Sequence, residues 1–492
     1  MGGQFQRLMG FTPSVDPTYP GAILNCQNLI PTIRGLAGAP SPTPFGNPAF
    51  PSAVKGAASC ELLSGAYRTF AGTATDLYEV VGNTNTVVSA TAGAYTGGNN
   101  PWRFVQFGNA SLAANGSDTI QQTINSGPFA AITGAPIANI LEAVQGFVFA
   151  LGTRDATNGY RPNGWWCSAL YDQTNWTPSQ STQCANGVIV DQPGAITAGK
   201  ALGTNIIVYK QQSMFYGVYE GPPVIWAFNQ ISPTVGTPSQ ECVVPVGVRH
   251  LFLGSDRQVY SFDGTVPEPI GDEVHEWLTA NWSATYQANV QSYHDQQNSR
   301  VFWYFCSSNN TTGIPDMSLV YNYRTGKFGR ADLGVEATVL TISGQITWAG
   351  MGSLPNVTTW NTLPTIPYNS SYWAASAPRQ GFIDTSHKLQ SLSGACQSAS
   401  LVTGWMGDDF NYTDFLGFIP RFKAAPTTCT GTAATQAVLG HDSTATQWTL
   451  SPYYDGELAA DFSARYAQVA LNFTGDFEIL GITPHINGSG EI

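Results

Sequence analysis

The sequence predicts an all-β protein with a β-propeller-like core of six or seven blades, an N-terminal arm and a C-terminal β segment. The 492 residues include 52 Gly, 31 Pro and 12% aromatic residues, a composition typical of chains that turn often between short strands. Similar apolar hairpins recur along residues 61–350. Segments with helical periodicity are scarce, which favours an all-β fold over a mixed one.

Residues 1–60 predict an extended arm. They end in AGAPSPTPFGNPAFPSAVKG, where proline is too frequent for a helix or a central strand.

Residues 61–350 predict the propeller core, because one pattern recurs there: a short apolar run, a glycine with a polar turn, and a second apolar run. The pattern begins at seven places, which are Tyr67, Trp102, Gly146, Asn205, His250, Arg300 and Thr338. Each instance predicts a hairpin, and starts roughly 35 to 60 residues apart are compatible with blades of four short strands. A β-sandwich is the alternative, but so many similar units favour the propeller. Trp303, in the run VFWYF, is the predicted core anchor.

The stretch at residues 254–278, GSDRQVYSFDGTVPEPIGDEVHEWL, is rich in acidic side chains although only 11% of the chain is charged. Its first half predicts a hairpin in which Asp256 and Asp263 bond the N–H groups of turns.

The second half of this stretch begins a predicted short helix at residues 271–282, with an acidic first turn. Glu273, His275 and Glu276 on this helix are the candidate subunit-interface residues.

Residues 351–385 are rich in Pro, Asn and Ser and predict a connector. Residues 386–492 predict a C-terminal β domain, which could pack with the N-terminal arm as a platform. Within it, residues 464–486 predict two strands joined by a turn, with Val469, Leu471 and Phe473 on one face.

The net charge of −12 and the sequence pI near 4.8 argue against a protein that grips nucleic acid, because phosphate binding needs clustered Lys and Arg. An acidic surface is compatible with DNA that must slide past without adsorbing. No stretch reaches the 18 to 20 apolar residues that a membrane-spanning helix needs, so no membrane-spanning segment is expected.

Eight cysteines are scattered without a CxxC pair, which predicts buried thiols rather than zinc ligands. Cys167 and Cys184 lie in a predicted long loop, and they are the one pair that could form a disulfide.

The sequence contains no catalytic, metal-binding or cofactor-binding motif. Six histidines are too separated for a zinc pattern, and nucleophile elbows, phosphate loops and dinucleotide fingerprints are absent. We therefore expect no enzymatic activity and no cofactor. Two alternatives stay open: a propeller-type glycosidase or depolymerase, and a carbohydrate-binding protein of a virion surface. Trp165 and Trp166 are candidate partner-contact aromatics.

Six motifs occur in an order that resembles the tail hub, or nozzle, proteins of short-tailed bacteriophages, including packaged-DNA stabilisation proteins. They are LNCQNLIPTIRGL at 24–36, YRTFAGTATDLYEV at 67–80, WRFVQFGNASLAANGSD at 102–118, HLFLGSDRQVYSFDG at 250–264, LVYNYRTGKFG at 319–329 and ARYAQVALNFTGDFEILGI at 464–482. Residues 155–200 and 350–375 have no counterpart in this resemblance.

The resemblance implies a structural virion protein of the viral tail: a propeller-containing subunit of a homo-oligomeric, usually hexameric, ring. The ring would lie below the portal and adaptor proteins and continue the DNA channel, with tail fibres or spikes attached nearby. It would retain packaged double-stranded DNA, without sequence-specific contact, until DNA ejection. The implied localisation is the virion tail, assembled in the host cytoplasm.

Overall fold

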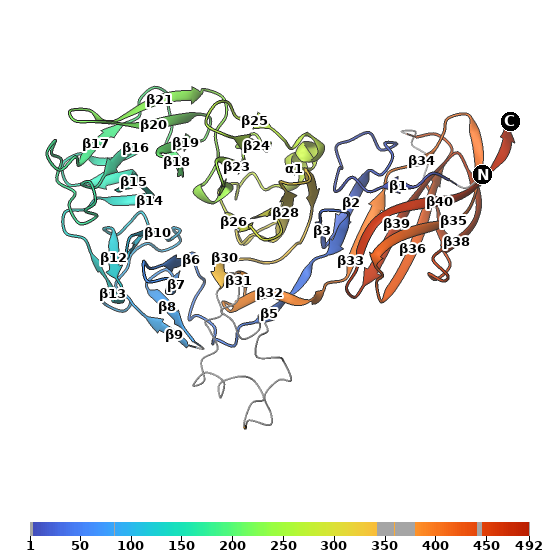
Figure 1. Cartoon of the computed structure of the whole chain (residues 1–492), viewed down its shortest axis with the longest axis horizontal. Coiled ribbons are helices and arrows are strands. Elements are labelled where there is room, and N and C mark those ends of the chain that lie inside the picture. The colour runs from blue at the N-terminus through green and yellow to red at the C-terminus, as the bar shows by residue number, and fades with distance from the viewer. Residues whose placement is uncertain (1–2, 83, 342–358, 360–378, 440–444, 492) are drawn as a thin grey trace.

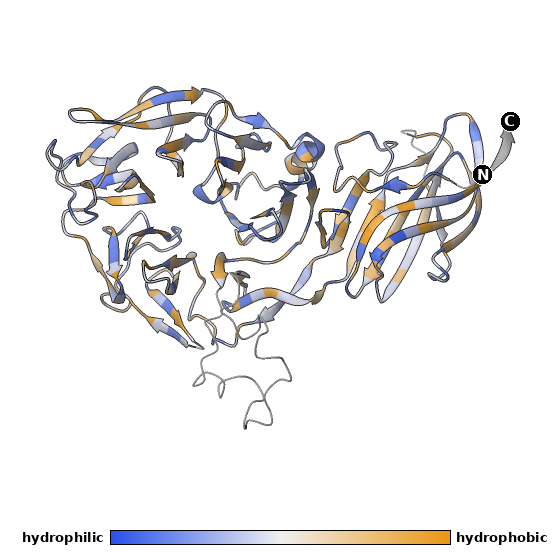
Figure 2. Cartoon of the chain, viewed as in Figure 1, coloured by the Kyte–Doolittle hydropathy of each residue, from blue (hydrophilic) through white to orange (hydrophobic). Residues whose placement is uncertain are grey.

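The computed structural model describes residues 3–82, 84–341, 359, 379–439 and 445–491. These residues form two parts that lie side by side: a ring of small sheets, and a pair of larger sheets beside which both chain ends lie (Figure 1). Hydrophobic residues recur along the strands of both parts (Figure 2).

The ring consists of seven four-stranded antiparallel sheets within the described residues. Blades 1 and 2 contain β6 (Gly56–Glu61), β7 (Tyr67–Gly72), β8 (Leu77–Val81), β9 (Thr84–Val87), β10 (Arg103–Phe107), β11 (Ala110–Ala114), β12 (Gln121–Ile124) and β13 (Ser126–Ala131). Blades 3 and 4 contain β14 (Ile137–Val144), β15 (Phe147–Asp155), β16 (Gly159–Cys167), β17 (Ala185–Val188), β18 (Ile196–Leu202), β19 (Asn205–Lys210), β20 (Met214–Gly221) and β21 (Ile225–Ser232). Blades 5 and 6 contain β22 (Val243–Val246), β23 (Arg249–Leu253), β24 (Val259–Phe262), β25 (Glu268–Pro269), β26 (Val290–Asp295), β27 (Arg300–Phe305), β28 (Met317–Asn322) and β29 (Lys327–Gly329). Blade 7 contains β30 (Ala337–Thr341), β31 (Arg379–Ile383), β32 (Leu389–Cys396) and β5 (Pro40–Pro44).

The ring closes on itself. The first strand of each blade contacts the first strand of the next, and β30 contacts β6. The ring is therefore a β-propeller, as predicted, with seven blades. Strand β5 comes from the predicted arm and pairs only with β32, at the outer edge of blade 7. An edge strand needs no ladder partner on its open side, which is why the sequence PSPTP can occupy it.

Five of the seven predicted hairpins are hydrogen-bonded strand pairs within single blades: β7–β8, β10–β11, β19–β20, β23–β24 and β27–β28. The hairpin predicted at residues 146–155 is wrong, because that run is the single strand β15. Its Gly152, with φ +61°, lies where the pairing with β16 shifts register, so the glycine marks a bulge instead of a turn. The instance from Thr338 lies largely outside the described residues. Trp303 is fully buried in β27, as predicted.

The second part is a β-sandwich. One sheet contains β1 (Gln6–Arg7), β3 (Leu29–Pro31), β4 (Leu36–Gly38), β35 (Asn411–Ala424), β38 (Leu458–Ala464) and β40 (Glu478–Glu491). The other contains β2 (Ile23–Gln27), β33 (Ala399–Thr403), β34 (Met406–Gly407), β36 (Thr428–Gln436), β37 (Thr446–Thr449) and β39 (Tyr466–Thr474). Phe415 and Phe462 of the first sheet share a buried core with Leu471 of the second. Strands from both ends of the chain thus build one domain.

The strands predicted at residues 464–486 form, and Val469, Leu471 and Phe473 are buried on one face. The two strands nevertheless do not pair. Strand β39 bonds to β33 and β36, whereas β40 bonds to β35 and β4. The turn between them crosses from one sheet to the other, so the predicted hairpin is an arch between layers. Periodicity indicates which side chains point inward, but it does not select the pairing partner.

The domain boundaries differ from the predicted ones at 60, 350 and 385. The predicted arm supplies four sandwich strands and also β5 and β6 of the propeller. The predicted connector contains β31, and its residues 351–358 and 360–378 lie outside the described residues. The predicted C-terminal domain begins with β32, which belongs to blade 7. Local composition marks strands and turns, but long-range pairing decides which sheet a strand joins.

The propeller and the sandwich are joined rigidly. The paired strands β5 and β32 both run directly into the sandwich (Figure 1). One apolar core continues from blades 5 and 6 into it. Phe11 of the N-terminal segment packs edge-on against Trp277 of the helix α1 (His275–Asn281), with ring centroids 5.0 Å apart. The guanidinium of Arg330 lies 4.9 Å from the centre of the Trp277 ring. Two chain connections and a shared core leave little freedom between the domains.

Candidate functional site

The predicted interface helix forms as the 3₁₀ turn η2 (Asp272–Val274) followed by α1. Glu273 is half-buried, and its main-chain oxygen accepts a hydrogen bond from the N–H of Ser14 at 2.9 Å. Burial raises the pKa of the Glu273 carboxyl, the Asp272 carboxylate raises it further, and Lys327 lowers it. Glu273 is therefore part of the joint with the N-terminal segment, and its role at a subunit interface stays a prediction.

The other two candidates on the helix differ in exposure. His275 is half-buried, and its Nδ1 lies 3.3 Å from the main-chain oxygen of Arg257. Glu276 is exposed, and its backbone N–H donates to Oγ of Ser14 at 3.2 Å. The Glu276 carboxylate remains available to a neighbouring molecule.

Trp165 and Trp166 are not the exposed aromatics that the sequence predicts. Both lie in β16, the third strand of blade 3, and each is only 7% exposed. Successive side chains of a strand point to opposite faces, so Trp165 packs with Phe149 and Phe228 while Trp166 enters the core shared with blade 2. A partner could reach neither ring without opening the blade.

Two aspartates stabilise turns of blade 5. Asp256 accepts a hydrogen bond from the N–H of Gln258, and Asp263 accepts one from the N–H of Thr265, so both stabilise turns as predicted.

All eight cysteines are free thiols. Cys184 Sγ lies 3.2 Å from the main-chain oxygen of Cys167, to which it donates, and no disulfide joins them.

A salt bridge crosses the axis of the propeller. Arg103 begins β10 of blade 2, and Glu241 lies in the 3₁₀ turn η1 (Gln240–Cys242) that leads into blade 5. The guanidinium contacts the carboxylate through two hydrogen bonds of 2.9 and 3.0 Å, and it donates a third, of 2.9 Å, to the main-chain oxygen of Asn139. Arg103 lines three cavities along the axis, of about 130, 170 and 620 Å³. The ion pair thus obstructs the tunnel.

Further charges lie near the salt bridge between Arg103 and Glu241. Lys200 of blade 4 is 3.8 Å from Glu142 of blade 3. Burial raises the pKa of Glu142, and Lys200 opposes this. For Glu241, burial also raises the pKa, but the charge and hydrogen bonds of Arg103 and the charge of Lys200 leave it below its ordinary value. Glu241 is accordingly a carboxylate at neutral pH.

The largest of the three cavities forms the mouth of the tunnel, and we call it the mouth cavity. Its volume is about 620 Å³, and its lining includes Asn100, Ser117, Asn139, Arg154, Tyr160 and Asn289. Gly116, with φ +72°, makes room for one of these amides, because a Cβ there would lie 2.4 Å from Oδ1 of Asn139. The guanidinium of Arg154 lies 5.2 Å from the centre of the Tyr160 ring.

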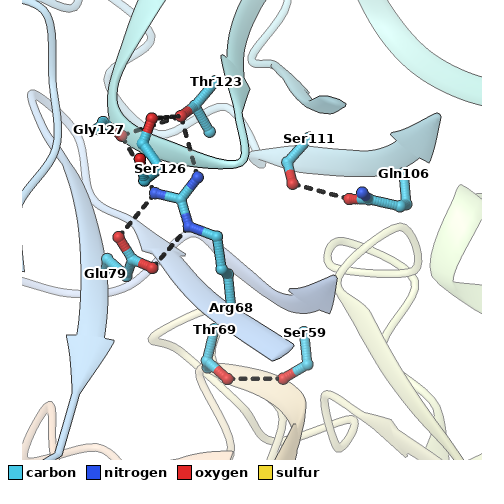
Figure 3. A network of polar contacts seen from close by, with 9 residues as sticks. All are labelled: Ser59, Arg68, Thr69, Glu79, Gln106, Ser111, Thr123, Ser126 and Gly127. Carbon is cyan, nitrogen blue, oxygen red and sulfur yellow. Dashed lines mark hydrogen bonds and ion pairs between the residues drawn. The ribbon is translucent and has the colours of Figure 1, made fainter. Parts of the chain in front are cut away.

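A buried network couples blades 1 and 2 (Figure 3). Arg68 of β7 is 6% exposed and forms a bidentate ion pair with Glu79 of β8 at 2.7 Å. The same guanidinium donates to Oγ1 of Thr123 at 3.0 Å and to the main-chain oxygen of Gly127 at 3.1 Å, both in blade 2. This network holds blades together and is remote from the axis.

Arg103, Glu241 and Arg154 are not among the residues that the sequence predicts for a site. The first two interrupt apolar runs, in PWRFVQF and QECVVPV, within a chain that has only 20 Lys and Arg residues. A charge that interrupts an apolar run was the available signal. Nothing local indicated that residues so far apart in the sequence would meet.

Among the residues that the structure describes, no group of three or more His, Cys, Asp or Glu could hold a metal ion. None of the helices described is both long and apolar enough to cross a membrane.

No protein-family model matches the sequence, and no curated protein matches it. The chain is similar to the solved structure of BBS1N in complex with ARL6DN, at 12% identity over 73% of this chain and 98% of that chain, with a TM-score of 0.40. It is similar to the Neurospora crassa Pan2 WD40 domain, at 8% identity over 72% and 95%, with a TM-score of 0.38. A third similar structure is YCF48 bound to D1 peptide, at 10% identity over 61% and 86%, with a TM-score of 0.35. The propeller assignment rests on the closed ring of seven sheets.

Proposed function

We propose that this protein is the ring-forming subunit of a tail hub, or nozzle, of a short-tailed bacteriophage. The observation that carries the proposal is the resemblance of six motifs in chain order. They fall in the sandwich (residues 24–36 and 464–482) and in blades 1, 2, 5 and 6 of the propeller. A resemblance spread over both domains supports kinship of the whole architecture more strongly than likeness of one hairpin would.

The rigid joint suits a subunit that holds position under load. A ring that retains packaged DNA must resist pressure along its axis, and a subunit with two freely moving domains would transmit that load poorly. The continuous core and the paired strands β5 and β32 make each subunit one block.

In the proposed ring the DNA would pass between subunits and not through the centre of a propeller, which the ion pair of Arg103 and Glu241 spans. The sandwich offers an acidic surface for the wall of such a channel, since Asp408, Asp409 and Asp461 are exposed on it. Like charge reduces adsorption of the duplex and keeps it able to slide. In this proposal the protein is structural and not an enzyme, it contacts portal, adaptor and fibre or spike proteins, and it resides in the virion tail.

The proposal is tested by imaging the purified protein and the virion. We expect closed rings, hexameric by the resemblance, at the portal vertex. Glu276→Lys should impair ring assembly, because this exposed carboxylate lies on the face of α1 proposed as the subunit contact. Glu273 is left unchanged, since reversing a half-buried charge would disturb the joint itself.

Glu220→Lys is the matched control, because Glu220 is an exposed acid in blade 4, away from the helix. Rings that form equally well in both variants would remove α1 from the interface. A monomer at all concentrations, or a monomer that degrades bacterial polysaccharide, would overturn the hub proposal and favour the depolymerase alternative.

A further inference from the structure

The mouth cavity has chemistry that a ring subunit does not require. Its volume, about 620 Å³, is in the usual range for small-molecule sites. Its lining comes from loops between blades, from the turn β11–β12, and from residues of the strands β14, β15, β16 and β18. Because it is built from several blades, its shape is set by the closed ring and not by a single loop.

Uncharged hydrogen-bonding groups dominate the lining. In the described part of the chain the side-chain amide of Asn139 makes no hydrogen bond. Asn100 and Asn289 use their amide nitrogens, towards Oγ of Ser117 and the main-chain oxygen of Gly313, which leaves their amide oxygens as acceptors. A ligand with several hydroxyl groups would match such a set of donors and acceptors.

One cation faces this polar wall without an acidic partner. Arg103 is already paired with Glu241 and also donates to the main-chain oxygen of Asn139. Arg154 is exposed, and its guanidinium makes no hydrogen bond or ion pair with any residue that the structure describes. Its contact is with the ring of Tyr160, which is 53% exposed. A single arginine beside an aromatic ring fits one carboxylate next to the face of a sugar ring.

We propose that the mouth cavity binds a saccharide that carries a carboxylate, such as a hexuronic acid unit of a bacterial surface glycan. Arg154 holds the carboxylate, Tyr160 contacts the ring, and the amides of Asn139 and Asn289 bond hydroxyl groups. This assigns to blade 3 a glycan contact that differs from Trp165 and Trp166, which are buried. The inference does not rest on the hub proposal, since a propeller in any assembly would carry the same cavity.

Other ligand classes fit less well. An apolar ligand would leave the amides unpaired, at a cost for each. A nucleic acid needs many cations to neutralise its phosphates, and this cavity supplies one that is not already paired. The acidic chain as a whole, with a net charge of −12, also opposes phosphate-rich polymers.

The test uses the full-length protein and a hexuronic acid disaccharide, compared with the same disaccharide after its carboxyl group has been reduced to an alcohol. Calorimetry and saturation-transfer NMR measure both, with inorganic phosphate as a third probe. We expect the uronate to bind at least about ten-fold more tightly than the reduced sugar, a difference of about 1.4 kcal/mol. Arg154→Gln should abolish this preference, and Tyr160→Leu should weaken both sugars.

Arg324→Gln is the matched control, because Arg324 is an exposed arginine in the β28–β29 turn of blade 6. It should bind like the wild type, and all variants should show the wild-type melting temperature. Equal binding of the two sugars, or loss of the preference in Arg324→Gln as well, would refute the carboxylate contact. Phosphate binding as tight as uronate binding, or no saturable binding of either sugar, would overturn the saccharide assignment.

Discussion

Glu241→Gln tests whether the ion pair across the tunnel stabilises the propeller. The side chains of Arg103 and Glu241 are 14% and 21% exposed, so their charges are mostly removed from water. Breaking a buried pair from one side costs about 3 to 5 kcal/mol, because the remaining charge has no partner. The glutamine oxygen can still accept one hydrogen bond from the guanidinium, and solvent reaches part of the pair. We therefore expect a loss of about 3 kcal/mol in the free energy of unfolding.

Urea denaturation followed by tryptophan fluorescence and circular dichroism measures this loss. Arg103→Met combined with Glu241→Leu should recover most of the stability, because two apolar groups leave no orphaned charge. Lys423→Gln is the control, since Lys423 is 53% exposed and its ion pair with Glu478 should contribute less than about 1 kcal/mol. If the free energies of unfolding of Glu241→Gln and Lys423→Gln differ by less than about 0.5 kcal/mol, the ion pair of Arg103 and Glu241 does not stabilise the propeller.

Three further predictions concern buried polar and aromatic groups. Burial lowers the pKa of His250 to about 4 in the folded protein, whereas its pKa in the unfolded chain is about 6.5. The unfolded chain therefore binds a proton first as the pH falls, and the free energy of unfolding should drop by about 3 kcal/mol between about pH 7 and pH 4. His250→Gln should remove this part of the pH dependence in melts across that range. Trp303→Ala should cost about 3 to 5 kcal/mol by urea titration, and a wild-type midpoint would contradict its place in the core. Glu79→Ala should cost about 3 kcal/mol because Arg68 is left buried, whereas Arg68→Met with Glu79→Leu should cost much less; equal losses in the single and double variants would disprove the coupling.

The local sequence predicted the propeller units well, and it predicted their assembly poorly. Runs such as residues 205–221 carry apolar strands on both sides of a polar turn, which is enough to predict a hairpin. Strand β5 carried no such signal, because its prolines exclude a central strand and its partner β32 is about 350 residues away. The sequence did not predict that β39 and β40 join different sheets. A hairpin within one sheet and an arch between two sheets satisfy the same alternating pattern.

Residues of the site were harder to predict than strands. Trp165 and Trp166 occur beside glycine and asparagine, which indicates a loop, yet two consecutive aromatics suit a strand packed on both faces equally well. The acidic residues near Glu273 predicted the helix correctly, but whether its face meets the same chain or another depends on where the N-terminal segment lies. Arg103 and Glu241 meet only because seven blades close a ring, a property of the whole chain.

The location of both chain ends in the sandwich has a consequence for synthesis on the ribosome. Gln6 pairs with Ile482, so the first strands to emerge must wait for nearly the last. At about 5 to 20 residues per second this delay lasts roughly 20 to 100 seconds, during which Leu8 lacks the main-chain oxygen of Leu480 that its N–H bonds in the folded domain. The sandwich is completed only after β40 has been made, and a chain that lacks β40 lacks the strand that pairs with β1. Assembly that recognises the finished sandwich would therefore accept only subunits that contain both β1 and β40.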